Sequence, residues 1–129
     1  MIAIDTNVLV RLLVRDDDDQ LARARAMLAD GPVFVSLVCL LETAWVLRSG
    51  YGVTAPSFKL AFERLLEAAE INVEARESMS WALSRSANGA DLADMLLVVA
   101  GRDCSKFATF DRRLQARVGP DAPIPVELV

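Results

Sequence analysis

The sequence contains no histidine. This absence excludes the Ser-His-Asp and Cys-His catalytic triads, an imidazole general base and a histidine-ligated zinc site. Cysteine is also scarce: Cys39 and Cys104 fall in apolar stretches that we predict to be helical, without the spacing of metal ligands. We expect two buried free thiols there. Any acid–base or metal chemistry in this chain must therefore depend on carboxylates.

Long apolar runs are missing as well, and glycine and proline are few. No run could span a bilayer and no basic leader precedes the first apolar residues, so we expect a cytoplasmic protein. Hydrophobic residues make up 53% of the chain and charged residues 25%, which is typical of one globular domain over residues 1–129. The net charge of −4 argues against a nucleic-acid partner unless bound divalent cations reverse the local field.

The first residues carry the earliest chemical signal. Met1–Ile4 is apolar and too short for a helix, which predicts a strand buried on both faces of a parallel sheet. Asp5 follows it, and Thr6 and Asn7 are suitable caps for a helix over residues 8–13. Ligand sites in open α/β sheets lie outside the carboxyl ends of strands. Asp5 is therefore a candidate site residue, and the alternative is a capping or solvated loop acid.

The rest of the chain alternates between short apolar runs and helical periodicity. This alternation predicts a three-layer α/β/α fold around a central, mainly parallel sheet of four to five short strands. We interpret the acidic run Asp16–Asp19 as a solvated helix start. Further strands are expected at Val33–Val35, Ile71–Val73, Lys106–Phe110 and Ile124–Val129, and further helices at 20–28, Leu37–Arg48, 54–66, Glu74–Ala87, 90–100 and 112–118.

Glu42 is the acid that is hardest to explain by structure alone. Its neighbours three and four residues away along the predicted helix are all apolar, Val38 and Trp45 among them. A glutamate on an apolar helix face is costly unless it is paired or binds a metal. We therefore treat Glu42 as a candidate ligand, with a buried arginine partner as the alternative.

Three more acids lie in the second half of the chain. Asp91 and Asp94 are three residues apart and share a face at the start of a very apolar helix. Asp91 has an alternative role as the N-cap of that helix, whereas Asp94 has Leu97 and Val98 on its own face. Asp111 follows a predicted strand and precedes a basic helix, which repeats the pattern of Asp5.

In such a fold Asp5, Glu42, Asp94 and Asp111 could converge on one pocket. Four ionised carboxylates cannot share a pocket unless cations neutralise them. An all-oxygen site without histidine suits Mg²⁺ or Mn²⁺. The sequence thus predicts a divalent metal site built from these four acids.

Four segments in this order resemble the motifs of the PIN-domain nucleases, and of the small bacterial VapC-type toxins in particular. The resemblance covers nearly the whole chain and implies that the acidic quartet is Asp5, Glu42, Asp94 and Asp111. It also implies supporting roles for Asn7 and Thr109 in binding metal or water, and a less settled role for Asp91. The four segments are Asp5-Thr6-Asn7, Glu42 in its apolar helix, Ala90–Leu96 and Thr109–Arg112.

The resemblance implies a metal-dependent endoribonuclease that acts as the toxin of a type II toxin–antitoxin pair. It implies an RNA substrate, 5′-phosphate products, a homodimer and a small cognate antitoxin, with no membrane partner. Arg11, Arg15 and the basic helix after Asp111 are candidate phosphate contacts, and ordinary surface arginines are the alternative. A catalytically silent PIN-fold partner-binding module is a rival function. A phosphatase of the haloacid-dehalogenase type ranks lower, because that family has a second aspartate where this chain has Asn7.

Overall fold

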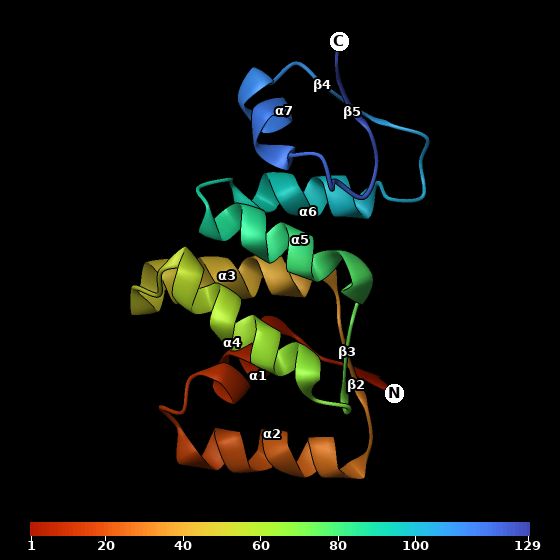
Figure 1. The fold of residues 1–129 in the computed structure, drawn as a ribbon. Coiled ribbons are helices and arrows are strands. Elements are labelled where there is room, and N and C mark those ends of the chain that lie inside the picture. Colours follow the sequence, from red (N-terminus) through yellow and green to blue (C-terminus); the bar gives the residue numbers. More distant parts are fainter. The chain divides into compact units, whose positions relative to one another are not determined.

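A computed structural model describes residues 1–129, and the chain divides into two compact units, Met1–Glu74 and Ala75–Val129. Each unit is described by itself (Figure 1). A single domain over the whole chain stays a prediction. No helix in the chain combines the length and the apolar character needed to cross a membrane.

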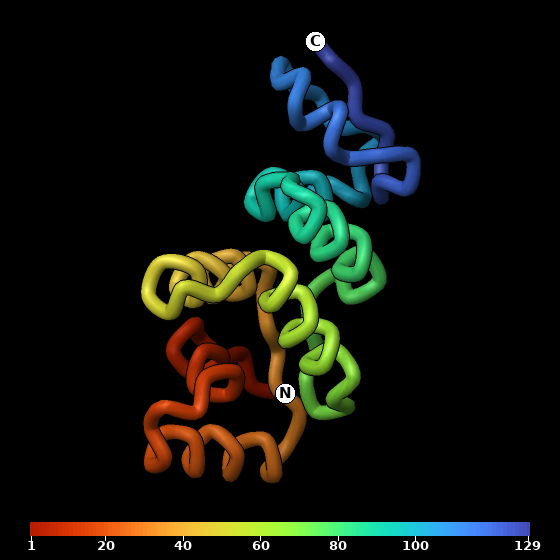
Figure 2. Tube along the Cα trace, turned by 60° about the vertical axis from the view of Figure 1, so that its left-hand side comes forward, coloured from red at the N-terminus to blue at the C-terminus, as the bar shows by residue number.

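The first unit contains a three-stranded parallel sheet with the strand order β1-β2-β3. Helix α1 packs against both α2 and α3, and Figure 2 shows its red trace between them. The largest fully buried side chains of this unit include Leu9, Leu40 and Phe62. The elements are β1 (Ile2–Ala3), α1 (Thr6–Leu13), α2 (Asp18–Asp30), β2 (Val33–Val35), α3 (Leu37–Tyr51), α4 (Ala55–Glu67) and β3 (Ile71–Val73).

The prediction that the first strand is buried on both faces is wrong. Strand β1 pairs with β2 alone, so it is the edge of its sheet, and both of its residues are exposed. Only Ile4, just beyond the strand, is buried. A short apolar run is typical of a buried strand, but it does not show whether the strand has one hydrogen-bonded neighbour or two.

The second unit has its own core around α5 and α6, where Met79, Leu83, Met95 and Val98 are buried. Its two strands are parallel and pair Phe107 with Val126. The indole Nε1 of Trp81 donates to the Val118 carbonyl at 3.0 Å and ties α5 to the end of α7. The elements are α5 (Arg76–Ala87), α6 (Leu92–Ala100), β4 (Phe107–Thr109), α7 (Arg112–Val118) and β5 (Val126–Leu128).

The predicted α/β class with short parallel strands is confirmed. The five strands form a three-stranded and a two-stranded sheet, where the sequence predicted one sheet. The periodicity of apolar residues locates strands, whereas pairing depends on main-chain hydrogen bonds between distant segments. Here Ile4 N donates to Phe34 O, and Phe107 N donates to Pro125 O.

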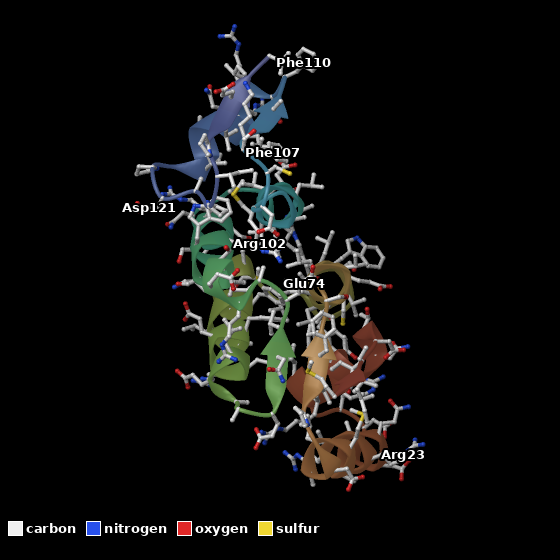
Figure 3. The ribbon with its side chains drawn as sticks, turned by 90° about the vertical axis from the view of Figure 1, so that its right-hand side faces the viewer. Arg23, Glu74, Arg102, Phe107, Phe110 and Asp121 are labelled. Carbon is white, nitrogen blue, oxygen red and sulfur yellow. The ribbon has the colours of Figure 1, made fainter.

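Several boundaries differ from the predicted ones for local reasons. Helix α3 continues past Ser49-Gly50 to Tyr51 and ends at Gly52, whose φ of 65° is left-handed and favours glycine. Helix α5 begins at Arg76 and not at Glu74. The Glu74 side chain (labelled in Figure 3) instead accepts a hydrogen bond from Leu37 N at the start of α3. Cys39 is a buried free thiol as predicted, but Cys104 is exposed in the turn that follows α6.

Candidate functional site

Asp5 leaves β1 and begins α1. Its Oδ1 accepts a hydrogen bond from Val8 N at 3.0 Å, so Asp5 is the N-cap, and Thr6 and Asn7 are the first residues of the helix. The prediction that Thr6 and Asn7 are the caps is therefore wrong. An aspartate one residue earlier takes the position in which a side-chain oxygen reaches the free N–H of the first turn. The cap occupies one carboxylate oxygen of Asp5 and leaves Oδ2 without a partner.

Glu42 on α3 accepts a hydrogen bond from Thr6. The Thr6 hydroxyl donates to Glu42 Oε2 at 2.7 Å, and Thr6 itself is buried. The expected burial of Glu42 is wrong: its side chain is exposed, and so are Val38 (73%) and Trp45 (67%) on the same helix face. Helix α3 is apolar on most sides, so apolar neighbours in the sequence did not identify its buried face. The alternative of a buried arginine partner does not occur.

Cys39 lies next to these two acids. Burial raises the pKa of its thiol, contacts with the Thr43 and Thr6 hydroxyls lower it, and the negative charges of Asp5 and Glu42 raise it. Both carboxylates therefore act on one buried thiol of α3. One turn further along α3, Thr43 is fully buried. The first unit thus brings Asp5, Glu42 and Thr6 together.

In the second unit, two of the predicted acids are helix caps. Asp91 Oδ1 accepts from Asp94 N at 3.3 Å and caps α6, which confirms the alternative role of Asp91. Asp111 Oδ1 accepts from Arg113 N at 2.7 Å and from Leu114 N at 3.3 Å and caps α7. The Thr109 hydroxyl accepts from Asp111 N at 3.0 Å and fixes the entry to this cap.

Asp94 has no hydrogen-bond or ion-pair partner for its carboxylate, and it is half-buried. Burial raises the pKa of Asp94, and the carboxylates of Asp91 and Asp111 raise it further. Two like charges therefore act on the half-buried Asp94, and neither of the ion pairs of this unit involves it. A bound cation would relieve this repulsion.

These residues fit a hard divalent cation. Every candidate ligand is a carboxylate, and oxygen donors without histidine or thiolate suit Mg²⁺ or Mn²⁺. By itself, neither unit brings three acidic or cysteine side chains close enough to hold a metal ion. Convergence of Asp5, Glu42, Asp94 and Asp111 on one metal stays a prediction.

The first unit also has a hollow of about 340 Å³ between α1 and α2, whose lining includes Asp5 and Asn7. Sequence reasoning did not find its α2 side, which includes Gln20 and Arg23. Those side chains follow an ordinary helical period, and only packing against α1 makes them part of a site. Arg11, a predicted phosphate contact, is already engaged by side chains of this unit.

Comparison with known protein families matches residues 2–119 to the PIN domain. The matched range includes Asp5, Glu42, Asp94 and Asp111, together with Asn7, Asp91 and Thr109. No curated protein and no solved structure matches the chain.

Proposed function

The chain belongs to the PIN domain family, whose fold is generally that of a metal-dependent nuclease, and on that premise we propose that it is a metal-dependent endoribonuclease. We propose further that it acts as the toxin of a type II toxin–antitoxin pair in the cytoplasm. Its partners would be RNA, a small cognate antitoxin and a second copy of the chain. The observation that carries the nuclease proposal is the half-buried Asp94 carboxylate, which lies in the first turn of α6 after Asp91 and has no hydrogen-bond or ion-pair partner in the chain.

In this proposal Asp5, Glu42, Asp94 and Asp111 hold Mg²⁺ or Mn²⁺. The metal would lower the pKa of an attacking water and stabilise negative charge at the phosphate. Asp91 keeps α6 capped, and Thr109 keeps Asp111 in place, so both act as positioning residues. Asn7 lies beside Asp5 at the hollow and would contact the substrate or water there.

Three of the four acids share one arrangement that supports this role. Asp5 and Asp111 each use Oδ1 to cap a helix, and Glu42 uses Oε2 to accept from Thr6. In each case the other carboxylate oxygen has no partner within the protein. A hydrogen bond to one oxygen fixes the direction of the second, which is how outer contacts orient metal ligands. The second oxygen of each of these acids would then be available to a cation.

A catalytically silent partner-binding module remains the second candidate. Val38 and Trp45 are large apolar side chains that α3 exposes to solvent. Exposed apolar patches favour protein contacts. The same surface would also serve a toxin that binds an antitoxin, so only a measurement of catalysis separates the two functions.

The decisive experiment is cleavage of a mixed RNA pool by purified protein with Mg²⁺ or Mn²⁺, beside EDTA and beside Asp94→Asn. Asp103→Asn, at an exposed turn position after α6, is the matched control and is purified in the same way. We expect cleavage that requires metal, disappears in Asp94→Asn and persists in Asp103→Asn. Equal cleavage by all three proteins would indicate a contaminating ribonuclease and would overturn the catalytic proposal.

The toxin role needs a separate measurement. Induced expression in bacteria should arrest growth for the wild type and for Asp103→Asn, and should leave growth unchanged for Asp94→Asn. Growth arrest by Asp94→Asn at the same protein level would contradict a toxin that acts by cleaving RNA.

A further inference from the structure

We infer that the hollow between α1 and α2 binds the base of the RNA nucleotide next to the cleaved phosphate, and that it selects a keto base, uracil or guanine. This inference rests on the proposed function, because the neighbouring acid Asp5 is a proposed metal ligand. It assigns substrate selection to residues outside the acidic quartet.

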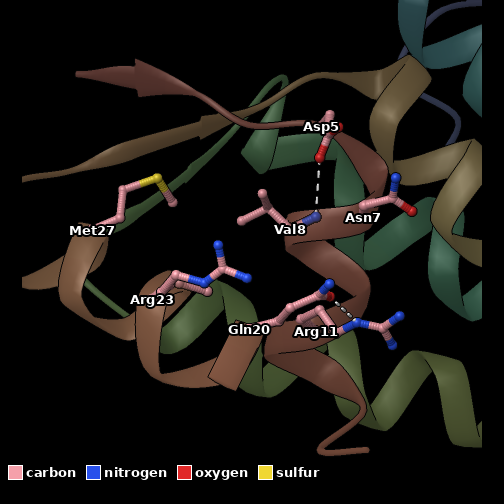
Figure 4. Close-up of a pocket in the computed structure, with 8 residues that line it drawn as sticks. Asp5, Asn7, Val8, Arg11, Gln20, Arg23 and Met27 are labelled. Carbon is pink, nitrogen blue, oxygen red and sulfur yellow. Dashed lines mark hydrogen bonds between the residues drawn. The ribbon is translucent and has the colours of Figure 1, made fainter. Parts of the chain in front are cut away.

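The hollow has the size and the walls of a base-binding pocket. Its volume is about 340 Å³, within the usual range for small-ligand sites. Val8 from α1 and Met27 from α2 give it apolar surface (Figure 4). Ala24 of α2 adds to this surface. Flat bases pack well on such surface, and a thioether adapts its shape to a ring. Asp5 lies at the same hollow, so a base bound there has its phosphate near that acid.

Gln20 provides polar groups at the edge of the hollow, and its amide has one orientation. Its Oε1 accepts a hydrogen bond from Arg11 Nε at 2.6 Å. A guanidinium only donates, so this contact must use the amide oxygen of Gln20 and not its nitrogen. The Gln20 NH₂ group therefore remains free, with two donors for a ligand.

Arg11 holds the Gln20 amide in place and does not itself bind the base. Its Nη1 donates to Asp16 Oδ1 at 2.7 Å and to the Tyr51 hydroxyl at 3.2 Å. The Tyr51 hydroxyl donates in turn to Asp16 Oδ2 at 2.8 Å. These contacts hold Arg11 from both sides, so that its Nε–H keeps the Gln20 amide in one orientation.

Arg23 adds further donors. In Figure 4 its side chain extends from α2 beside Met27 and toward α1. Its only partner is Asp19, one turn earlier, at 3.0 Å, and both side chains are highly exposed. An exposed ion pair of this kind contributes little stability, so Arg23 can turn to a ligand at small cost.

Gln20 and Arg23 together present N–H donors to the edge of a bound base. Uracil and guanine carry a carbonyl oxygen at the position where cytosine and adenine carry an amino group. A keto oxygen would accept from these donors, whereas an amino group would face them with its own hydrogens. A site that pairs with one edge discriminates against the other, because an amino base covers the donors of Gln20 and Arg23 without accepting from them.

Methyl signals of methionine test binding without any need for catalysis. The chain has four methionines, at positions 1, 27, 79 and 95, of which only Met27 lines the hollow. In EDTA, with methyl-labelled methionine, UMP and GMP should shift the Met27 signal. They should bind about fivefold tighter than CMP and AMP, the effect of roughly one hydrogen bond. Met79 and Met95 are fully buried in the other unit and serve as internal references.

Gln20→Glu gives the sharpest variant. Glutamate can still accept from Arg11 Nε, but the free NH₂ group becomes an acceptor oxygen. Gln20 lies in the first turn of α2, where an added carboxylate is favourable to the helix, so the variant should fold. We expect the preference to move from UMP toward CMP. Arg23→Ala should weaken UMP binding about fivefold, while Arg25→Ala, exposed on the same helix, should not change it.

The same variants separate this inference from the proposed function. If the wild type cleaves RNA, and Gln20→Glu and Arg23→Ala leave both the cut-site bases and UMP binding unchanged, the inference fails and the nuclease stands. If no RNA is cleaved but Met27 responds to UMP in preference to CMP, the base pocket stands and the nuclease fails. Equal Met27 shifts with all four nucleotides, or none, would overturn the base selection.

Discussion

The two units hold their acids in opposite ways. In the first unit each acid near α1 has a partner from the chain: Thr6 donates to Glu42, and Arg11 and Tyr51 bind Asp16. In the second unit the neighbours of Asp94 are like charges, Asp91 and Asp111, and they raise its pKa. The difference lies in Asp94: the first unit hydrogen-bonds or neutralises these acids, whereas the second leaves one half-buried carboxylate beside like charges and without a partner.

The largest expected effect concerns Asp5 and Asp111, which cap helices in different units. Asp5→Asn and Asp111→Asn keep a capping oxygen and remove the charge. Each should lower the rate of RNA cleavage by at least about 10³-fold, since a metal supplies several kcal/mol to such a transition state. The free energy of unfolding should change little, because asparagine caps helices about as well as aspartate. Cleavage kinetics and chemical denaturation measure the two effects.

Alanine at the same two positions removes the cap as well as the charge. Asp5→Ala and Asp111→Ala should lose the same activity and also about 1 kcal/mol of stability. Thr54 is the matched control, because its hydroxyl caps α4 by accepting from Ser57 N at 3.3 Å and it belongs neither to the acidic quartet nor to the hollow. Thr54→Ala should cost similar stability and no activity. Full activity in Asp5→Asn would show that Asp5 caps α1 and does not bind a metal.

The next effect tests the orientation of Glu42 by Thr6. Thr6→Val keeps the shape of a buried side chain and removes the hydroxyl that donates at 2.7 Å. Loss of such a contact behind a metal ligand should lower activity by about tenfold or more. Thr6→Ser restores the donor and should recover most of that loss. Equal activity in Thr6→Val and Thr6→Ser would show that Glu42 does not depend on this bond.

Much of the fold follows from local patterns in the sequence. Strands such as Val33–Val35 and Ile71–Val73 were predicted with their observed bounds, because a short apolar run between turn residues rarely forms anything other than a strand. Helix starts at Ser36 and Thr54 follow from capping chemistry. Strand partners were not predictable in this way, because the pairing of β1 with β2 joins residues about 30 positions apart.

The candidate acids can be selected from the sequence, but their environments cannot. Asp94 is half-buried, but it lies beside other acids, and Leu97 on its own helix face is exposed. Glu42 is exposed, because the apolar residues around it belong to a face that this unit leaves open. The α2 side of the hollow gave no signal, since Gln20 and Arg23 become neighbours of Asp5 only through helix packing. Local periodicity identifies faces, whereas tertiary packing decides which of them are covered.

A smaller effect concerns the pH dependence of stability without metal. The folded-state pKa of Asp94 is raised, so the native state holds its proton at pH values where the unfolded chain has lost it. The free energy of unfolding should therefore fall as the pH rises from the unfolded pKa through the folded pKa, and the cost persists above it. Asp94→Asn stays neutral and should lack this decline. Thermal unfolding in EDTA between about pH 4 and about pH 7 measures it.

Added Mg²⁺ should remove much of the same decline in the wild type and leave Asp94→Asn unchanged. Asp103→Asn is the control and should behave as the wild type does. Identical pH profiles for the wild type and Asp94→Asn would show that the crowding of Asp94 has no energetic consequence. The contrast between the two units would then lose its electrostatic basis.

The smallest effect lies at Asp16, an acid of the first unit that the chain itself neutralises. The hydrogen bond from Tyr51 lowers the pKa of Asp16, and the positive charge of Arg11 lowers it further. Its stabilising contribution is present above the unfolded pKa and is lost as the pH falls through the folded pKa. Tyr51→Phe should raise the pKa of Asp16 toward its ordinary value, which carboxyl-carbon NMR titration measures. Mg²⁺ should not alter this titration, because Asp16 is already paired with the cation Arg11. A metal-dependent pKa shift at Asp16 would contradict the contrast between acids that have a partner in the chain and acids that have none.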